Sequence, residues 1–469
     1  MHAAVVFVAL AIAGLAWALA TGDLTYRYVA SWSSSFTPLP YRLGAVWAGP
    51  SGALLLWAFA LGAGAAMGSA TLERGSSLRA WSGALLALLL VALLAMACVD
   101  SSPFLRLAFA PDDGRGLPLE WMRPVVLVQM PLGYVAMALV SVPAVITVMG
   151  AIGRAPWQET ARRWALAVWA LAGAAMLFDW RRRYGDTAWS EDWRWAPVHA
   201  GTAFAWAGAS LLVVATHRRW RANASLGAAF AAFTLALVGL TMRRAFGWDG
   251  VHEFAASAVG RAAAWLTLAL VLAGTVDAIR GTRGVRAVSA WALRLALGAL
   301  IASAAVLVMV AFTRTQTVEL REGDRARVSD RFGATWTLSL EGVSTVGREN
   351  VIANVIAVRA AAKGRGSAFM TAEVRSLYSG AANEPVDQLI VSGVSAGLLQ
   401  DIRLDVREAT NTDAMVDVRF VPVATWLWMA GAVAVLAALV AALLPMPGEM
   451  GVSSEPPTAG PNAPSTEAA

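Results

Sequence analysis

The feature that most constrains this chain is a series of long apolar stretches separated by short polar segments. Stretches of about 18 residues or more are long enough to cross a bilayer as helices. We predict ten spans, near residues 3–20, 44–70, 80–98, 124–150, 164–179, 197–216, 225–241, 257–278, 291–312 and 424–444. Only 14% of the 469 residues are charged, which is well below the share in soluble domains. The expected fold is therefore mostly α, a polytopic membrane helix bundle.

Arginine placement predicts how the bundle is oriented. One set of loops is short and rich in arginine, with Arg74 and Arg79 in the first of these loops and Arg162 and Arg163 in the second. The opposite loops are longer and balance their arginines with acidic residues. Since basic residues concentrate in short cytoplasmic loops, both termini are expected in the cytoplasm. The basic charge is then explained by contact with membrane lipid, and nucleic acid is not an expected partner.

Residues 313–422 have a different pattern. Six segments alternate apolar and polar residues, a period typical of half-buried strands; they are residues 335–342, 354–360, 369–378, 387–394, 401–408 and 415–423. We predict a small extracytoplasmic β-barrel or sandwich here. The helix bundle should then occupy 1–312, the final transmembrane helix 423–444, and a disordered cytoplasmic tail 445–469.

The single cysteine, Cys98, excludes an intramolecular disulfide, and there is no CxxC or CxxCH motif. The chain therefore neither shuttles thiols nor carries covalently attached c-type haem of its own. Cys98 is expected to pack in a core.

Histidines are the natural ligands of a membrane haem protein, and His252 is the strongest candidate among four. It lies in RRAFGWDGVHEFA beside two carboxylates, which could orient its second ring nitrogen. Arg243 and Arg244 precede it and could pair with haem propionates. The alternative is that His252 is a solvated loop histidine and that the arginines form ion pairs with the neighbouring carboxylates.

Three tryptophans, Trp189, Trp193 and Trp195, cluster in an outside loop, residues 188–206, that leads into the predicted sixth span. Such an aromatic surface could stack a flat apolar macrocycle. It could equally anchor the chain at the membrane interface. The residues themselves leave both interpretations open.

Several motifs resemble those of CcmF-type cytochrome c assembly proteins, the WWD-domain haem-handling family, in the same chain order. YRLGAVWAGPSGALLLW, residues 41–57, resembles the family's opening, although Pro50 and Ser51 replace its His-Glu. Residues 103–119 are similar to its external loop. VQMPLGYVAM, residues 128–137, resembles its His-Pro-Pro-Leu-Leu-Tyr, with Gln129 in place of the histidine.

The later motifs continue the resemblance. The stretch from residue 188 to His199 is similar to the WWD signature, which Trp189, Trp193 and Trp195 match. The segment of residues 244–255 places His252 on the family's second external haem histidine. The chain is shorter than the family pattern and departs from it at three of four ligand histidines. Met130, beside Gln129, is the second axial ligand that we would test, and the alternative is that it only packs.

The resemblance implies cytochrome c maturation in a bacterial inner membrane, with the β domain facing the periplasm or cell exterior. It implies a transiently bound b-type haem, with His252 as metal ligand and a haem chaperone, apocytochrome c and other maturation subunits as partners. Because the ligand histidines are incomplete, haem lyase activity stays open. The alternatives are a non-catalytic scaffold of the same family that binds no haem and an unrelated transporter.

Overall fold

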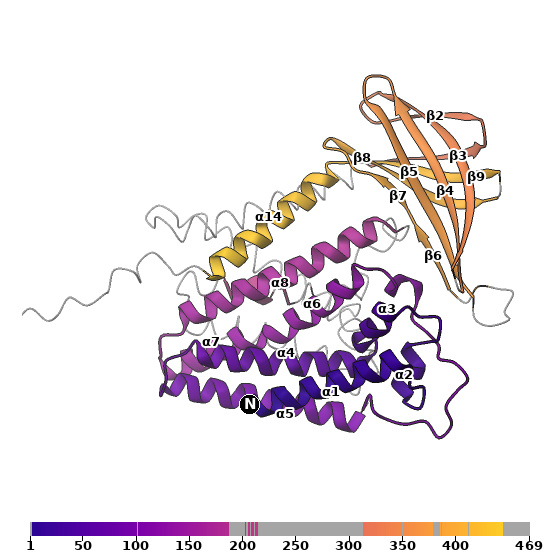
Figure 1. Ribbon diagram of the computed structural model, residues 1–469. Helices are drawn as coiled ribbons and strands as arrows, with labels where there is room; N and C mark the ends of the chain where they lie inside the picture. The colour runs from indigo at the N-terminus through magenta and orange to yellow at the C-terminus, as the bar shows by residue number, and fades with distance from the viewer. Residues whose placement is uncertain are drawn as a thin grey trace, which may run out of the picture.

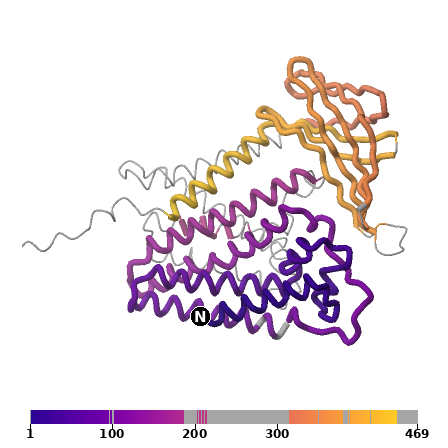
Figure 2. Tube along the Cα trace, in the orientation of Figure 1, coloured from indigo at the N-terminus to yellow at the C-terminus, as the bar shows by residue number. Residues whose placement is uncertain are grey.

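A computed structural model describes residues 2–100, 102–186 and parts of 202–213, and then 313–443 apart from 349, 379–384, 386 and 411. A bundle of long helices carries a β domain at one end (Figure 1). The β domain runs directly into the last described helix, α14 Ala424–Leu443, which lies along the bundle (Figure 2).

The described helices form a bundle whose members differ in length. Their bounds are α1 His2–Thr21, α2 Arg27–Trp32, α3 Leu39–Gly44, η1 Ala45–Trp47, α4 Pro50–Ala70, α5 Ser77–Asp100, η2 Leu119–Trp121, α6 Val126–Leu139, α7 Ser141–Gly153, α8 Gln158–Tyr184 and α14 Ala424–Leu443. Within the described ranges, six segments are long and apolar enough to cross a membrane: α1, α4, α5, α6 with α7, α8 and α14. The predicted spans at 197–216, 225–241, 257–278 and 291–312 lie wholly or mostly outside the described residues.

Two predicted spans differ from the structure in their detail. The span expected at 44–70 begins as a helix only at Pro50, after a short 3-10 turn. The span expected at 124–150 is two helices that meet at Val140. Pro143 has no N–H, so the carbonyl of Leu139 lacks its usual helical donor and the helix is interrupted there.

Helix α8 is longer than the predicted 164–179 because both of its ends are stabilised. At its start, Glu159 pairs with Arg162 at 2.8 Å and with Arg163 at 2.7 Å. Its last turn carries three consecutive arginines, which are favourable at the negative end of the helix dipole. The arginine-rich end of α8 lies against the β domain (Figure 1).

Tyr28 organises the start of α4. Its hydroxyl lies 2.9 Å from the carbonyl oxygens of Ala45 and Val46 and accepts the Gly49 N–H at 2.9 Å. A Cβ added at Gly52 would overlap both this hydroxyl and the Val46 carbonyl. Glycine at this position therefore allows the first turn of α4 to pack on the loop that precedes it.

Among the described residues, the β domain has nine strands in two antiparallel sheets. The strands are β1 Arg314–Arg321, β2 Arg325–Ser329, β3 Thr335–Arg348, β4 Val351–Ala362, β5 Gly366–Leu377, β6 Asp387–Val391, β7 Gly393–Ser395, β8 Gln400–Ala409 and β9 Asp413–Pro422. One sheet has the order β1-β9-β8-β7 and the other β2-β3-β4-β5-β6. The two sheets enclose an apolar core that includes Leu338, Val358, Leu404 and Phe420.

Comparison with the predicted strands shows two omissions and one error. Strands β1 and β2 were not predicted, and they carry charged residues at most outward positions. The strand expected at 387–394 is two strands, β6 and β7, that belong to different sheets.

Cys98 also differs from its prediction. We expected it to pack in a core, and the structure exposes it near the end of α5.

We expect Gly52→Ala to lower thermal stability, because the new methyl would overlap backbone and the Tyr28 hydroxyl. Overpacking of this kind costs about 1–3 kcal/mol or more. Gly153→Ala is the matched control, since nothing lies within 4 Å of the added Cβ. Thermal unfolding in detergent measures both variants, and equal midpoints would contradict the packing described for α4.

Candidate functional site

The structure describes one of the seven predicted site residues. Met130 lies half-buried in α6. The other six, Trp189, Trp193, Trp195, Arg243, Arg244 and His252, lie outside the described residues. What the structure does describe is the chain on either side of the tryptophan-rich segment.

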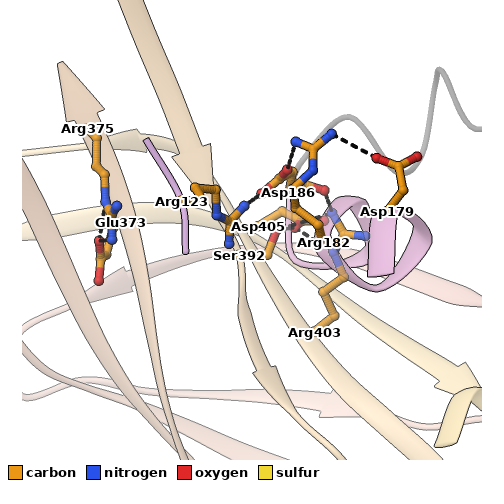
Figure 3. Close-up of polar contacts among 9 residues, drawn as sticks. All are labelled: Arg123, Asp179, Arg182, Asp186, Glu373, Arg375, Ser392, Arg403 and Asp405. Carbon is orange, nitrogen blue, oxygen red and sulfur yellow. Dashed lines mark hydrogen bonds and ion pairs between the residues drawn. The ribbon is translucent and has the colours of Figure 1, made fainter. Parts of the chain in front are cut away.

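Three parts of the chain converge on Asp186, the last described residue before that segment. Its carboxylate accepts a hydrogen bond from Arg123, which lies just before α6, and a longer one of 3.5 Å from Arg182 of α8. Its backbone carbonyl accepts a hydrogen bond from Arg403 of β8. The adjacent Gly185 carbonyl accepts the N–H of Ser392 at 2.8 Å. The entrance to the segment is thus held by the chain before α6, by α8 and by the β domain together (Figure 3).

Arg403 is the centre of this cluster. Its side chain is fully buried. The guanidinium Nε lies 2.8 Å from Oδ1 of Asp405, whose carboxylate is the counter-ion. Its second nitrogen donates to the Ser392 hydroxyl at 3.1 Å, and Asp405 also pairs with Arg419 at 3.1 Å. Burial lowers the pKa of Arg403, and the neighbouring Asp405 carboxylate opposes that change. The result is a charged pair held out of water at the boundary between helix and sheet.

Helix α8 extends the cluster of charges into the bundle. Arg182 pairs with Asp179 at 3.1 Å, and both side chains are almost completely buried. Arg182 therefore lies between Asp179 and Asp186 (Figure 3). Buried charges require this kind of mutual compensation, because each one alone would lose its hydration at high cost.

A second contact between helices and β domain is centred on Asp401. Its carboxylate accepts hydrogen bonds from the hydroxyls of Tyr184 at 3.0 Å and Thr425 at 3.2 Å, and from the Gly397 N–H at 3.0 Å. Tyr184 ends α8 and Thr425 begins α14, so one carboxylate joins both helices to the sheet. Burial raises the pKa of Asp401, although these hydrogen bonds oppose the rise.

The far side of the tryptophan-rich segment is also fixed to the bundle. The described residues between 202 and 213 are helical. A Cβ built on Gly133 of α6 would lie 3.0 Å from the Thr202 hydroxyl, so the two helices cross closely at this point. The Trp169 ring of α8 donates to the Ser210 hydroxyl at 3.0 Å. The chain therefore returns from residues 187–201 to a defined place between α6 and α8.

Met130 and Gly133 are three residues apart and share a face of α6. Gln129, beside Met130, is buried, and its side-chain oxygen has no hydrogen-bond partner within the described ranges. A thioether is a soft donor that haem iron accepts. Met130 therefore stays the predicted second ligand, on a helix that crosses the chain closely at Gly133 and Thr202.

The charge cluster was not predicted from the sequence. In β8, Asp401, Arg403 and Asp405 alternate with apolar residues, and this was interpreted as a strand with one solvated face. The structure buries both faces, because the end of α8 covers the polar one. The strict alternation of opposite charges at 401, 403 and 405 was the signal available in the sequence.

The chain is similar in sequence to known proteins over about half of its length. No family model matches the chain. The cytochrome c-type biogenesis protein CcmF of Pseudomonas aeruginosa is 31% identical over 260 residues, which cover 53% of this chain and 39% of that protein. The cytochrome c-type biogenesis protein ccl1 of Rhodobacter capsulatus is 30% identical over 259 residues, again 53% of this chain and 39% of the relative. The chain thus covers less than half the length of these relatives.

A solved structure titled cytochrome c heme lyase CcmF has the same fold. It aligns with a TM-score of 0.63 over 94% of this chain and 90% of the other, at 18% identity. The similarity therefore includes the β domain as well as the helix bundle, beyond the half of the chain that the sequence matches cover.

We expect Arg403→Met to destabilise the contact between β domain and helices by about 1.5–3 kcal/mol, because it removes charge-assisted hydrogen bonds to Asp405 and to the Asp186 carbonyl, while Asp405 keeps Arg419 as a counter-ion. Arg321→Met is the matched control. Arg321 pairs with Glu319 at 2.9 Å on the surface, with both side chains more than half exposed, and such pairs contribute about 1 kcal/mol or less. Denaturant unfolding measures both variants, and similar losses would rule out a special role for the buried charge.

The raised pKa of Asp401 predicts a pH dependence. The ordinary pKa of an aspartate is 3.8, and the pKa of Asp401 in the folded state is higher. Between these two values the folded state binds this proton and the unfolded state has largely lost it. Stability should therefore fall as pH rises through that window, and level off above the raised pKa. Asp401→Asn should remove this fall. Thermal midpoints between about pH 4 and pH 7 measure it, and an unchanged slope in the variant would contradict the assignment.

Proposed function

Because the chain is a CcmF-type protein in sequence and fold, we propose that it takes part in cytochrome c maturation, handling haem and attaching it to apocytochrome c. The names of its relatives support this proposal. Haem is the cargo of this reaction, held only until it is transferred.

The observation that carries the proposal is the fixation of the tryptophan-rich segment at both ends. Asp186 is held by Arg123 and Arg403 at one end. Thr202 lies against Gly133 at the other. A cargo surface has to be presented in a constant position relative to the acceptor, and this anchoring provides such a position.

In this proposal, Trp189, Trp193 and Trp195 form the apolar surface on which the porphyrin stacks. His252 donates an imidazole nitrogen to the iron, and an adjacent carboxylate orients its second nitrogen. Met130 of α6 would offer its thioether sulfur as a second ligand to the iron.

Arg243 and Arg244 pair with the propionates of the cargo as charge-assisted hydrogen bonds. These contacts fix the rotation of the ring about its normal, which stacking alone does not do. The bound haem supplies vinyl groups for thioether formation with apocytochrome cysteines, and the residues of this chain hold and orient it.

The proposed location is a bacterial inner membrane, with the β domain on the periplasmic side. The short basic loops support this orientation. Arg74 follows α4, Arg79 lies in the first turn of α5, and Arg154 follows α7, at helix ends remote from the β domain (Figure 1). Basic residues at that end favour its placement in the cytoplasm. A haem chaperone and other maturation subunits would then act with the chain on the opposite side.

We expect His252→Ala to remove most of the haem that copurifies with the full-length protein after expression with ample haem. Met130→Leu should shift the absorption bands of the reduced form, because it removes an axial ligand while keeping a similar volume. Reduced-minus-oxidised absorption spectra measure both effects. His2→Ala serves as the control, and it should leave the spectrum unchanged.

Colourless but folded native protein would contradict haem handling and would favour the scaffold alternative, in which the chain docks apocytochrome or partner subunits. Retention of a normal spectrum in His252→Ala would reject His252 as ligand while leaving haem handling intact.

A further inference from the structure

The turn between β7 and β8 has an unusual surface. It contains two adjacent leucines, Leu398 and Leu399, which are 65% and 69% exposed. Two adjacent leucines are seldom left this exposed in water without a partner.

This turn is rigidly held. Leu398 accepts a hydrogen bond from the Trp426 ring at 2.8 Å, and Leu399 accepts one from the Val423 N–H at 3.1 Å. Gly397 donates to Asp401 at 3.0 Å, and a Cβ on this glycine would collide with the carbonyl of Gln400. The backbone groups of the turn point inward to partners. The leucine side chains are consequently presented outward in a fixed position.

The turn lies level with the beginning of a membrane span. Its two hydrogen-bond donors, Val423 and Trp426, flank the start of α14 at Ala424, and α14 is long and apolar enough to cross a bilayer. Trp426 is itself half exposed, and tryptophan is enriched where a span meets the headgroup layer.

The exposed leucines are continuous with the outer stripe of α14. Along that helix the exposed apolar side chains recur at helical spacing, at Trp426, Met429, Val433, Leu436, Val440 and Leu443. A stripe of this kind on a spanning helix faces lipid. The leucine pair extends the same apolar surface from the helix onto the β domain.

We propose that Leu398 and Leu399 insert, together with Trp426, into the headgroup and acyl boundary of the leaflet on the β-domain side. The occupant of this surface is the lipid bilayer. The β domain is then supported at two separate places: the buried charges join it to α8, and the leucine turn rests it on the membrane beside α14. The bilayer thereby sets the height and tilt of the domain. This inference does not depend on haem binding.

The test uses spin labels on the full-length protein in vesicles of phosphatidylethanolamine and phosphatidylglycerol. Cys98→Ser removes the native thiol, and Leu398→Cys or Leu399→Cys then introduces one labelling site in each variant. Collision with oxygen, which concentrates in lipid, is compared with collision with a water-soluble nickel complex. We expect oxygen accessibility at both sites to exceed nickel accessibility several-fold.

Met415→Cys is the matched control. Met415 is an exposed apolar residue near the beginning of β9, at the opposite end of that strand from α14. Its label should favour the nickel complex. Equal nickel accessibility at Leu398, Leu399 and Met415 would overturn the proposal in favour of water. Protection of the leucine sites from both reagents would overturn it in favour of a protein partner.

Discussion

The pairing of Arg403 with Asp405, out of contact with water, is the interaction on which the arrangement of this molecule depends. Taken alone, either charge would be costly to bury. Together they allow a strand of the β domain to donate hydrogen bonds to the backbone that follows α8. The sheet and the bundle are consequently joined by directed polar contacts as well as by apolar packing.

The compensation extends through consecutive turns of α8. Asp179, Arg182 and Asp186 alternate in charge along one face of the helix end, and Arg123 adds a cation from the chain before α6. Arg182 and Asp186 each have two partners in this cluster, so its members act as a coupled network rather than as separate pairs. Asp401 makes a similar connection through neutral hydroxyls, and it includes α14 in the same boundary.

Much of the helical architecture could be predicted from the sequence, because apolar length is a strong signal. The breaks at Pro50 and Val140 could not be placed from length alone, since they depend on which backbone groups lose a donor. Strand β8 shows a second limit. Its alternation correctly predicted a strand, but the burial of Arg403 depends on α8, which is distant in sequence.

The candidate site was predictable only in part. The tryptophans and His252 were selected by residue type and by resemblance, and they lie outside the described residues. Met130 was selected by its neighbour Gln129, and both prove to lie near a close crossing of helices. The residues that hold Asp186 carry no recognisable motif. Their role depends on three segments that are distant in sequence and meet at Asp186 in the fold. A local sequence pattern does not indicate such a meeting point.

Ser392 has a further consequence for the mechanics of the domain. It stands between Val391, at the edge of one sheet, and Gly393, at the edge of the other, and its N–H is bonded to Gly185. Helix α8 therefore ends on the seam where the two sheets pass into each other. Separation of the two sheets at this edge would therefore strain the hydrogen bond between Ser392 and Gly185, so motion within the β domain is coupled to the end of α8.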